Sequence, residues 1–157
     1  AIWAAGEPRG MVLAGLGCRD TLRLEAALPL YGNELSDDIN PFVARLGRFV
    51  KLDREAFSGQ AALRRTKEDG ARRSLIGLKM TGRGVPRHGY RLTVGQEDLG
   101  WVTSGGYSPT LDENIALAMV TANRLTEGDP VDVVIRDRAT PATVCKTPFY
   151  RRQRRSS

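Results

Sequence analysis

The chain has 157 residues, of which 41% are hydrophobic and 27% are charged, the balance of an ordinary globular protein. Its formal net charge is +6, but Arg151, Arg152, Arg154 and Arg155 supply four of these charges in the last seven residues. Without this basic tail the net charge is about +2, and only 6% of residues are aromatic, so composition argues against nucleic-acid binding. No apolar run approaches the roughly 20 residues of a membrane-spanning helix, and no membrane partner is expected.

The chain contains few residues of the kinds that bind metals or act as nucleophiles. Cys18 and Cys145 lie far apart, and we expect two buried free thiols in a reducing cytoplasm. His88 is the only histidine, so no metal site is expected. Neither Cys18 nor His88 has a local catalytic signature, and a nucleophile–base pair between them is disfavoured.

The first 72 residues mix helical and extended patterns. Pro8 and Pro29 end helices, and glycines 59 and 70 flank another. The predicted elements are, in order, a helix end at 1–6, a buried strand at 11–16, a helix at 18–28, a loop at 33–40, a strand at 49–52 and a helix at 60–68.

After Arg73 the hydrophobic pattern acquires the period of two that is typical of strands. Short apolar segments are separated by glycine- and proline-containing turns, and Ser104–Thr110 is interpreted as one such tight turn. Strands are predicted at 76–80, 89–94, 98–103, 115–121, 131–136 and 139–145. The fold class is therefore α+β, with a mixed region at 1–72 and a small antiparallel β-barrel or sandwich at 73–157.

Arg19 and Arg23 lie four residues apart on one face of the helix predicted at 18–28. One interpretation is that Asp20 and Glu25 neutralise them in structural ion pairs. The other is that one guanidinium group binds an anionic or polar ligand with its rigid donor fork. Composition and spacing leave both interpretations open.

A series of short motifs resembles the T-protein family of the glycine cleavage system. The motifs occur in family order at Gly15–Ala26, Leu30–Asn33, Phe57–Gln60, Arg87–Tyr90, Val102–Thr110, Asn114–Ala118 and Pro148–Tyr150. The resemblance runs from about Gly6 to Arg151, which is nearly the whole chain.

The resemblance implies a three-domain fold around a folate site. Residues 1–72 would be the C-terminal part of the folate-binding domain, and 73–157 the C-terminal barrel. The family reaction transfers a one-carbon unit from the aminomethyl-lipoyl arm of the H-protein to tetrahydrofolate and releases ammonia. The family's catalytic aspartate lies upstream of the matched region, so no residue of this chain is assigned a catalytic role. We expect the chain alone to be inactive and to self-associate through an edge formed by Met11, Val12 and Leu13.

The resemblance also nominates folate-binding residues. Arg19 matches a family position that contacts folate, whereas Arg23 has no such match and is interpreted as structural. Arg151 matches a C-terminal arginine that reaches the folate site in some members. Arg48 stands where many members place a tryptophan, and it would stack on folate or pair with a carboxylate. Ala27 replaces a common family glycine.

Because Arg48 departs from the family pattern, two alternatives stay open. One is the folate module of a flavoprotein that resembles dimethylglycine or sarcosine dehydrogenase. The other is a non-catalytic folate-binding paralogue. The sequence upstream of Ala1 would separate these alternatives from the aminomethyltransferase.

Overall fold

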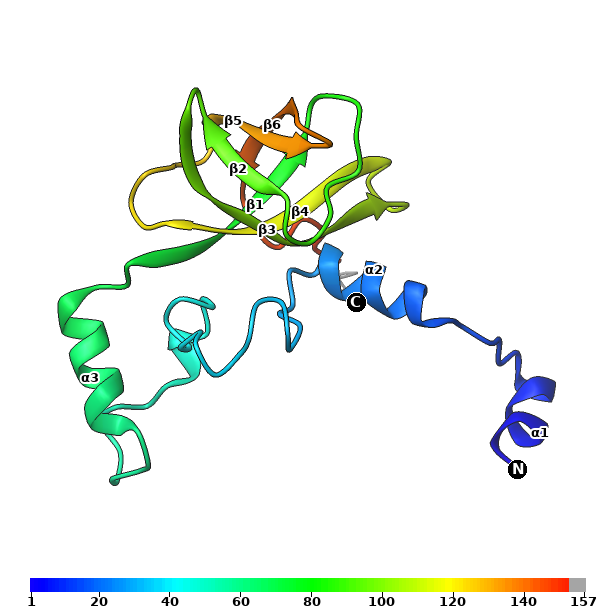
Figure 1. Cartoon of the computed structure of the whole chain (residues 1–157). Helices are drawn as coiled ribbons and strands as arrows, with labels where there is room; N and C mark the ends of the chain where they lie inside the picture. The colour runs from blue at the N-terminus through cyan, green and yellow to red at the C-terminus, as the bar shows by residue number, and fades with distance from the viewer. Residues whose placement is uncertain (153–157) are drawn as a thin grey trace.

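The structure is a computed structural model that describes residues 1–152, so Arg154 and Arg155 of the basic tail lie outside the described residues. Three α-helices precede the sheet, namely α1 (Ile2–Gly6), α2 (Leu16–Glu25) and α3 (Gln60–Asp69). Short 3₁₀ turns occur at Glu7–Arg9 and Gly47–Phe49. The helices lie to one side of the sheet, and α1 extends away from the rest of the molecule (Figure 1).

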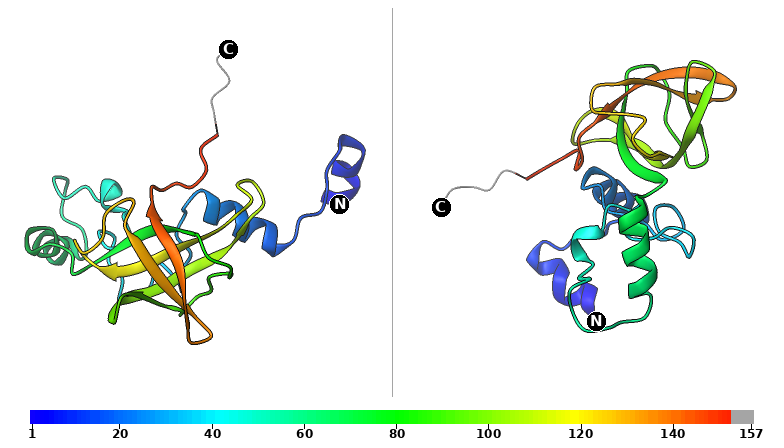
Figure 2. Two further views of the ribbon diagram at one scale, coloured as in Figure 1. Left: turned by 90° about the horizontal axis from the view of Figure 1, so that it is seen from above. Right: turned by 90° about the vertical axis from the view of Figure 1, so that its left-hand side faces the viewer.

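Six antiparallel strands close into a barrel in the order β1-β4-β3-β2-β5-β6. The strands are β1 (Arg73–Met80), β2 (Arg91–Val94), β3 (Glu97–Ser108), β4 (Glu113–Thr121), β5 (Pro130–Ile135) and β6 (Arg138–Cys145). Each overlaps a predicted strand, and the predicted α+β class with a C-terminal antiparallel barrel is confirmed. The views in Figure 2 show the barrel beside the loosely packed N-terminal segment.

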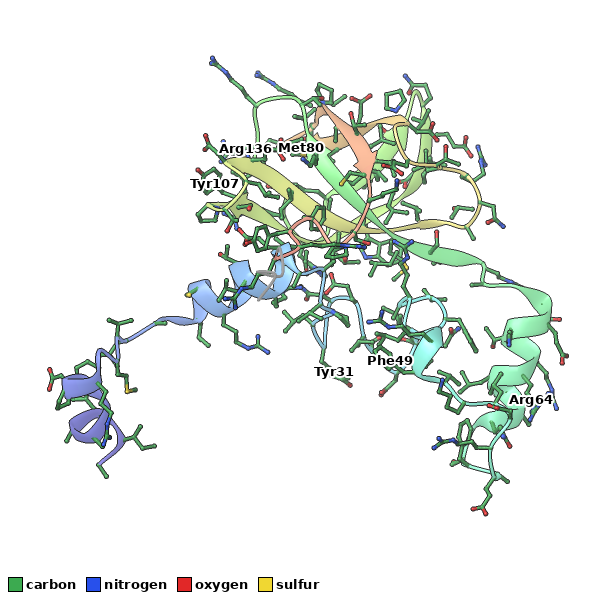
Figure 3. The ribbon with its side chains drawn as sticks, turned by 180° about the vertical axis from the view of Figure 1, so that it is seen from behind. Tyr31, Phe49, Arg64, Met80, Tyr107 and Arg136 are labelled. Carbon is green, nitrogen blue, oxygen red and sulfur yellow. The ribbon has the colours of Figure 1, made fainter. Side chains whose placement is uncertain are left out.

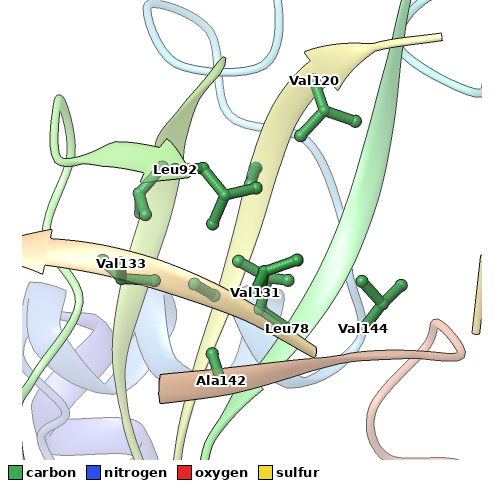
Figure 4. Packing of buried hydrophobic residues seen from close by; sticks show 10 residues of the cluster. Leu78, Leu92, Val120, Val131, Val133, Ala142 and Val144 are labelled. Atoms are coloured by element: carbon green, nitrogen blue, oxygen red, sulfur yellow. The ribbon is translucent and has the colours of Figure 1, made fainter. Parts of the chain in front are cut away.

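Aliphatic side chains fill the barrel. Figure 4 shows them converging from all sides of the closed sheet. The cluster consists of Leu78, Leu92, Val102, Ala116, Ala118, Val120, Val131, Val133, Ala142 and Val144. On β4, β5 and β6 the cluster takes every second residue, as the predicted period of two requires.

Strand β4 is buried on both faces. Its even-numbered residues from 116 to 120 face the barrel interior, while its odd-numbered residues from 115 to 119 belong to a second cluster outside. All six are at most 1% exposed. The three odd-numbered residues pack with Leu24 of α2 and with Val43 in the outer cluster. The N-terminal segment therefore packs against the outside of the barrel.

Two of the predicted strands are wrong. Residues 11–15 are not hydrogen-bonded to any described strand, and Val12 and Leu13 are each 79% exposed. Residues 47–49 form a 3₁₀ turn and the chain then continues as turns rather than as the strand predicted at 49–52. The apolar character of these segments is real, but a strand also needs a neighbour with which to pair, and the described residues provide none.

The turn predicted at Ser104–Thr110 is also wrong in position. Strand β3 continues to Ser108, and the turn to β4 occupies residues 109–112. Gly105 permits this because a Cβ there would lie 2.7 Å from the carbonyl oxygen of Pro86. The glycine therefore marks a close approach of two backbones rather than a turn.

Helix α2 ends in a Schellman motif with an unusual residue at the left-handed position. The amide of Leu28 donates to the Arg23 carbonyl, and the amide of Ala27 donates to the Leu24 carbonyl, each at 2.8 Å. Ala27 has a φ of 52°, where a side chain is disfavoured. The glycine that the family commonly has here would suit this conformation better.

We therefore expect Ala27→Gly to raise the free energy of unfolding by about 0.5–1 kcal/mol, since glycine removes the left-handed strain but adds entropy to the unfolded chain. Chemical denaturation checks this. Ala26→Gly is the matched control, because Ala26 has an ordinary φ of −79° and should lose a similar amount. A loss of stability in Ala27→Gly would contradict the strained, left-handed conformation of residue 27.

Gly100 in β3 has a φ of 152°, and a Cβ there would overlap the carbonyl oxygen of Met119 on β4. We expect Gly100→Ala to lower the free energy of unfolding by about 2–5 kcal/mol through backbone strain and displacement of β4. Gly106→Ala in the same strand is the control, because a Cβ at this position would have no atom within 4 Å apart from its own residue and its two neighbours in the chain. Gly100→Ala should melt at a clearly lower temperature than Gly106→Ala. Equal melting temperatures would contradict the prediction and show that β3 moves away from β4 to make room for the Cβ.

Candidate functional site

Helix α2 has one exposed end and one buried end. Residues 16–20 are all exposed, whereas Arg23, Leu24 and Glu25 are buried. Arg19 lies in the exposed half and has no ion-pair partner within residues 1–152. An unpaired guanidinium group on a rigid helix is free to bind an anion.

Arg23 has the opposite environment, although it shares a helix face with Arg19. Its Nη2 lies 2.6 Å from Asp20 Oδ1, and its Nη1 lies 3.1 Å from Glu34 Oε2. Glu34 is fully buried and also accepts a hydrogen bond from the amide of Leu30 at 2.9 Å. The structural interpretation therefore holds for Arg23, which fastens α2 to the loop that follows it.

Glu25 fastens the same helix to the barrel. Its Oε1 accepts hydrogen bonds from Ser108 Oγ at 2.6 Å and from the Thr110 amide at 3.2 Å, and its Oε2 accepts one from Thr110 Oγ1 at 2.8 Å. The interpretation that pairs Glu25 with Arg19 or Arg23 is therefore wrong, because the carboxylate is hydrogen-bonded to Ser108 and Thr110 instead. The local pattern carries no signal for this contact, since more than 80 residues separate the two sides.

The hydrogen bonds keep the Glu25 carboxyl ionised. Burial by itself raises its pKa, but the hydrogen bonds from Ser108 and Thr110 outweigh burial and leave the pKa below its ordinary value. Such a carboxylate stabilises the fold above the ordinary pKa of glutamate, and this contribution is lost as the pH falls through the lowered pKa.

Arg48 lies at the edge of a hollow of about 280 Å³ beside the buried end of α2. The hollow is bounded by residues 26–29, 44–46 and 48–49, by Leu75 and Leu117 of the barrel, and by Thr147 and Pro148. The guanidinium carbon of Arg48 stacks 4.6 Å from the centre of the Phe49 ring, whose position is labelled in Figure 3. Arg48 is exposed, and this cation–π contact holds its guanidinium group against Phe49 at the edge of the hollow.

Arg151 is exposed and follows Tyr150, whose amide donates to the carbonyl oxygen of Glu25 at 3.0 Å. The segments that carry Arg48 and Arg151 thus both meet the buried end of α2. Arg19 lies on the same helix, six residues or about 1.7 turns before Glu25. The described structure brings the three segments to one helix but shows no direct contact among the three guanidinium groups.

The two thiols differ in environment. Cys18 is exposed on α2, so its predicted burial is wrong, and Cys145 is partly buried. Burial raises the pKa of the Cys145 thiol to about 11, although the charge of Lys79 opposes this. His88 instead places Nδ1 2.7 Å from the Thr103 carbonyl oxygen.

A second, larger hollow of about 910 Å³ lies between the segment 41–57 and α3. Its walls include Pro41, Phe49, Phe57 and Leu63, and Phe49 is 64% exposed. Together with Val12 and Leu13, these residues leave the N-terminal segment rich in uncovered apolar surface.

Among residues 1–152, no helix combines the length and apolar character needed to cross a membrane. In the same part of the chain, no three His, Cys, Asp or Glu side chains gather as a group that could hold a metal ion.

Fold and site together define a class of protein in which an N-terminal helical segment with exposed arginines packs against the outside of a closed antiparallel barrel. A family model described as the glycine cleavage T-protein C-terminal barrel domain matches residues 73–151, and one described as the GCVT N-terminal domain matches 1–54. The chain belongs to the glycine cleavage T-protein family.

Individual relatives agree with this membership. The chain is 53% identical over 154 residues to an aminomethyltransferase of Moorella thermoacetica, covering 98% of this chain and 42% of the relative. It is 53% identical over 152 residues to one of Symbiobacterium thermophilum, covering 96% of this chain and 40% of that relative. The chain therefore spans about two fifths of the length of these curated relatives.

A solved structure shares the fold. The crystal structure of glycine cleavage system aminomethyltransferase T from Bartonella henselae superposes with a TM-score of 0.82 at 33% identity. The match covers 87% of this chain and 39% of that chain.

Proposed function

We propose that the protein containing this chain is the tetrahydrofolate-dependent aminomethyltransferase of the glycine cleavage system. It would take the aminomethyl group from the lipoyl arm of the H-protein, pass the one-carbon unit to tetrahydrofolate and release ammonia. The observation that carries the proposal is the match of nearly the whole chain to aminomethyltransferases at about half identity, across both the helical segment and the barrel. We further propose a domain boundary between residues 72 and 73 and a cytoplasmic location, which suits two free thiols.

The arginine set fits the proposed ligand. Folate carries carboxylate and carbonyl oxygens, and guanidinium groups are the donors that bind such oxygens best. Arg19 lacks an ion-pair partner in the described chain, and Arg48 and Arg151 are exposed near the end of the same helix. When bound, tetrahydrofolate supplies the nitrogen that accepts the one-carbon unit. The role proposed for Arg19, Arg48 and Arg151 is to bind and orient the folate.

The alternatives are less well supported. A folate module of a dimethylglycine or sarcosine dehydrogenase-like flavoprotein would share the barrel, but the similar relatives are aminomethyltransferases. A non-catalytic folate-binding paralogue would lack the aspartate that the family carries upstream. The upstream coding sequence separates all three, because it would contain a dinucleotide-binding domain, an aspartate or neither.

Arg19→Ala should weaken tetrahydrofolate binding by about 1.5–3 kcal/mol, the contribution of a charge-assisted hydrogen bond. The dissociation constant would rise by about tenfold to more than a hundredfold in titration calorimetry. The chain should be tested together with the upstream region that its relatives carry. Arg65→Ala is the control, since Arg65 is an exposed arginine on α3. Unchanged affinity in Arg19→Ala would remove Arg19 from the site.

The chain alone should not catalyse the transfer, because catalysis needs two reactants and a carboxylate held in one geometry. Its exposed apolar residues, including Val12, Leu13 and Phe49, should cause self-association. Ammonia release from aminomethylated H-protein and light scattering test both expectations on one sample. Turnover by a monodisperse monomer would contradict them.

A further inference from the structure

Glu25 is a carboxylate placed where carboxylates are rarely found. It occupies the last residue of α2 and is 3% exposed. Removing a charge from water is unfavourable unless hydrogen bonds replace the lost hydration. The three hydrogen bonds from Ser108 and Thr110 provide that replacement. A leucine or methionine could fill this buried position without the cost of removing a charge from water. The carboxylate therefore has a role beyond filling space.

The geometry of these hydrogen bonds is directional. The Ser108 hydroxyl accepts a hydrogen bond from the Leu111 amide at 3.2 Å, which turns its own proton toward Glu25. Thr110 approaches with both its amide and its hydroxyl, one on each carboxylate oxygen. The end of α2 is therefore fixed in orientation as well as in position, which apolar packing alone would not achieve.

The backbone of the same residue holds a third segment. The carbonyl oxygen of Glu25 accepts the amide of Tyr150, the residue before Arg151. Glu25 thus joins α2, the turn after β3 and the C-terminal segment at one point. Two of the three proposed folate-binding arginines, Arg19 and Arg151, belong to segments that Glu25 joins.

Within residues 1–152, the first half of α2 has few contacts with the barrel. Residues 16–20 are exposed, and Leu22 is 61% exposed. The ion pairs of Arg23 lead to Asp20 and to Glu34, and the loop that carries Glu34 meets the barrel one residue away, where Asn33 Nδ2 donates to Ser104 Oγ at 3.0 Å. Arg23 therefore reaches the barrel only through this loop, whereas Glu25 is hydrogen-bonded to the barrel by its own side chain. Arg19 lies about 9 Å along the helix from Glu25 at 1.5 Å per residue. A small rotation at the fastened end would therefore move Arg19 substantially.

We propose that Glu25 is a positioning residue for ligand binding: it fixes the free end of α2 relative to the barrel and so sets where the Arg19 guanidinium group meets the ligand. This inference rests on the proposed function, in which Arg19 binds tetrahydrofolate. Glu25 itself does not contact the ligand.

A double-mutant cycle on tetrahydrofolate affinity tests the inference, with the chain joined to the upstream region of its relatives. Glu25→Ala should raise the dissociation constant at least about fivefold, and Glu25→Gln, which keeps one acceptor oxygen, should recover part of this. If Glu25 acts through Arg19, the double variant Arg19→Ala/Glu25→Ala binds within about twofold of Arg19→Ala alone. Fully additive effects would overturn the inference.

Two further variants guard against a simple folding defect. Ser108→Ala removes one partner of Glu25 from the barrel side and should couple to Arg19 in the same way if Glu25→Ala does not fold. Glu113→Ala is the matched control, because that carboxylate pairs with Lys79 on the barrel at 2.7 Å with both side chains 41% exposed. It should change the dissociation constant by less than about twofold.

A readout without ligand uses the exposed thiol next to Arg19. A nitroxide on Cys18, in a Cys145→Ser background, reports the mobility of the free half of α2. The spectrum should sharpen in Glu25→Ala and stay unchanged in Glu113→Ala. Unchanged mobility in Glu25→Ala would overturn the inference. The single variant Arg19→Ala separates the two ways in which the inference can fail. If it leaves folate affinity unchanged, the proposed role of Arg19 is wrong, whereas if it weakens binding and Glu25→Ala does not, only the role of Glu25 is wrong.

Discussion

The burial of β4 on both faces is the constraint on which the rest of the structure depends. Most barrel strands put one face toward the interior and the other toward water. In β4 the interior face completes the barrel core, and the outer face receives Leu24 of α2 and Val43. One strand therefore belongs to two hydrophobic clusters, and the helical segment has a defined place because residues 115–120 of this strand are apolar on both faces.

Polar contacts then refine what the apolar contact leaves approximate. Hydrophobic packing is largely non-directional, so Leu24 alone would allow α2 to pivot on the barrel. The carboxylate of Glu25 and the guanidinium of Arg23, both buried and both hydrogen-bonded, fix its direction. The other half of the helix exposes Arg19 to solvent, so one end of the element is anchored and the other end is accessible.

The N-terminal segment differs from the barrel in how completely it is packed. The barrel satisfies its own strands by closure, whereas residues 11–15 and 49–57 expose apolar side chains and pair with no described strand. Within the described residues these apolar surfaces stay uncovered. The apolar pattern at 11–16 therefore did not produce the predicted strand, because no described strand lies beside it to pair with.

The sequence by itself determined the barrel and the helices, because alternation along β1 to β6 and the proline and glycine boundaries of α2 and α3 are local properties. The family motifs likewise nominated Arg19. The resemblance also interpreted Arg23 as structural, and the tertiary structure supplied the physical reason, because Glu34 meets Arg23 only when the loop after α2 packs against the helix. Only the tertiary structure revealed the bond between Glu25 and Ser108, because residues separated by 83 positions meet only when the barrel closes and α2 packs against β4.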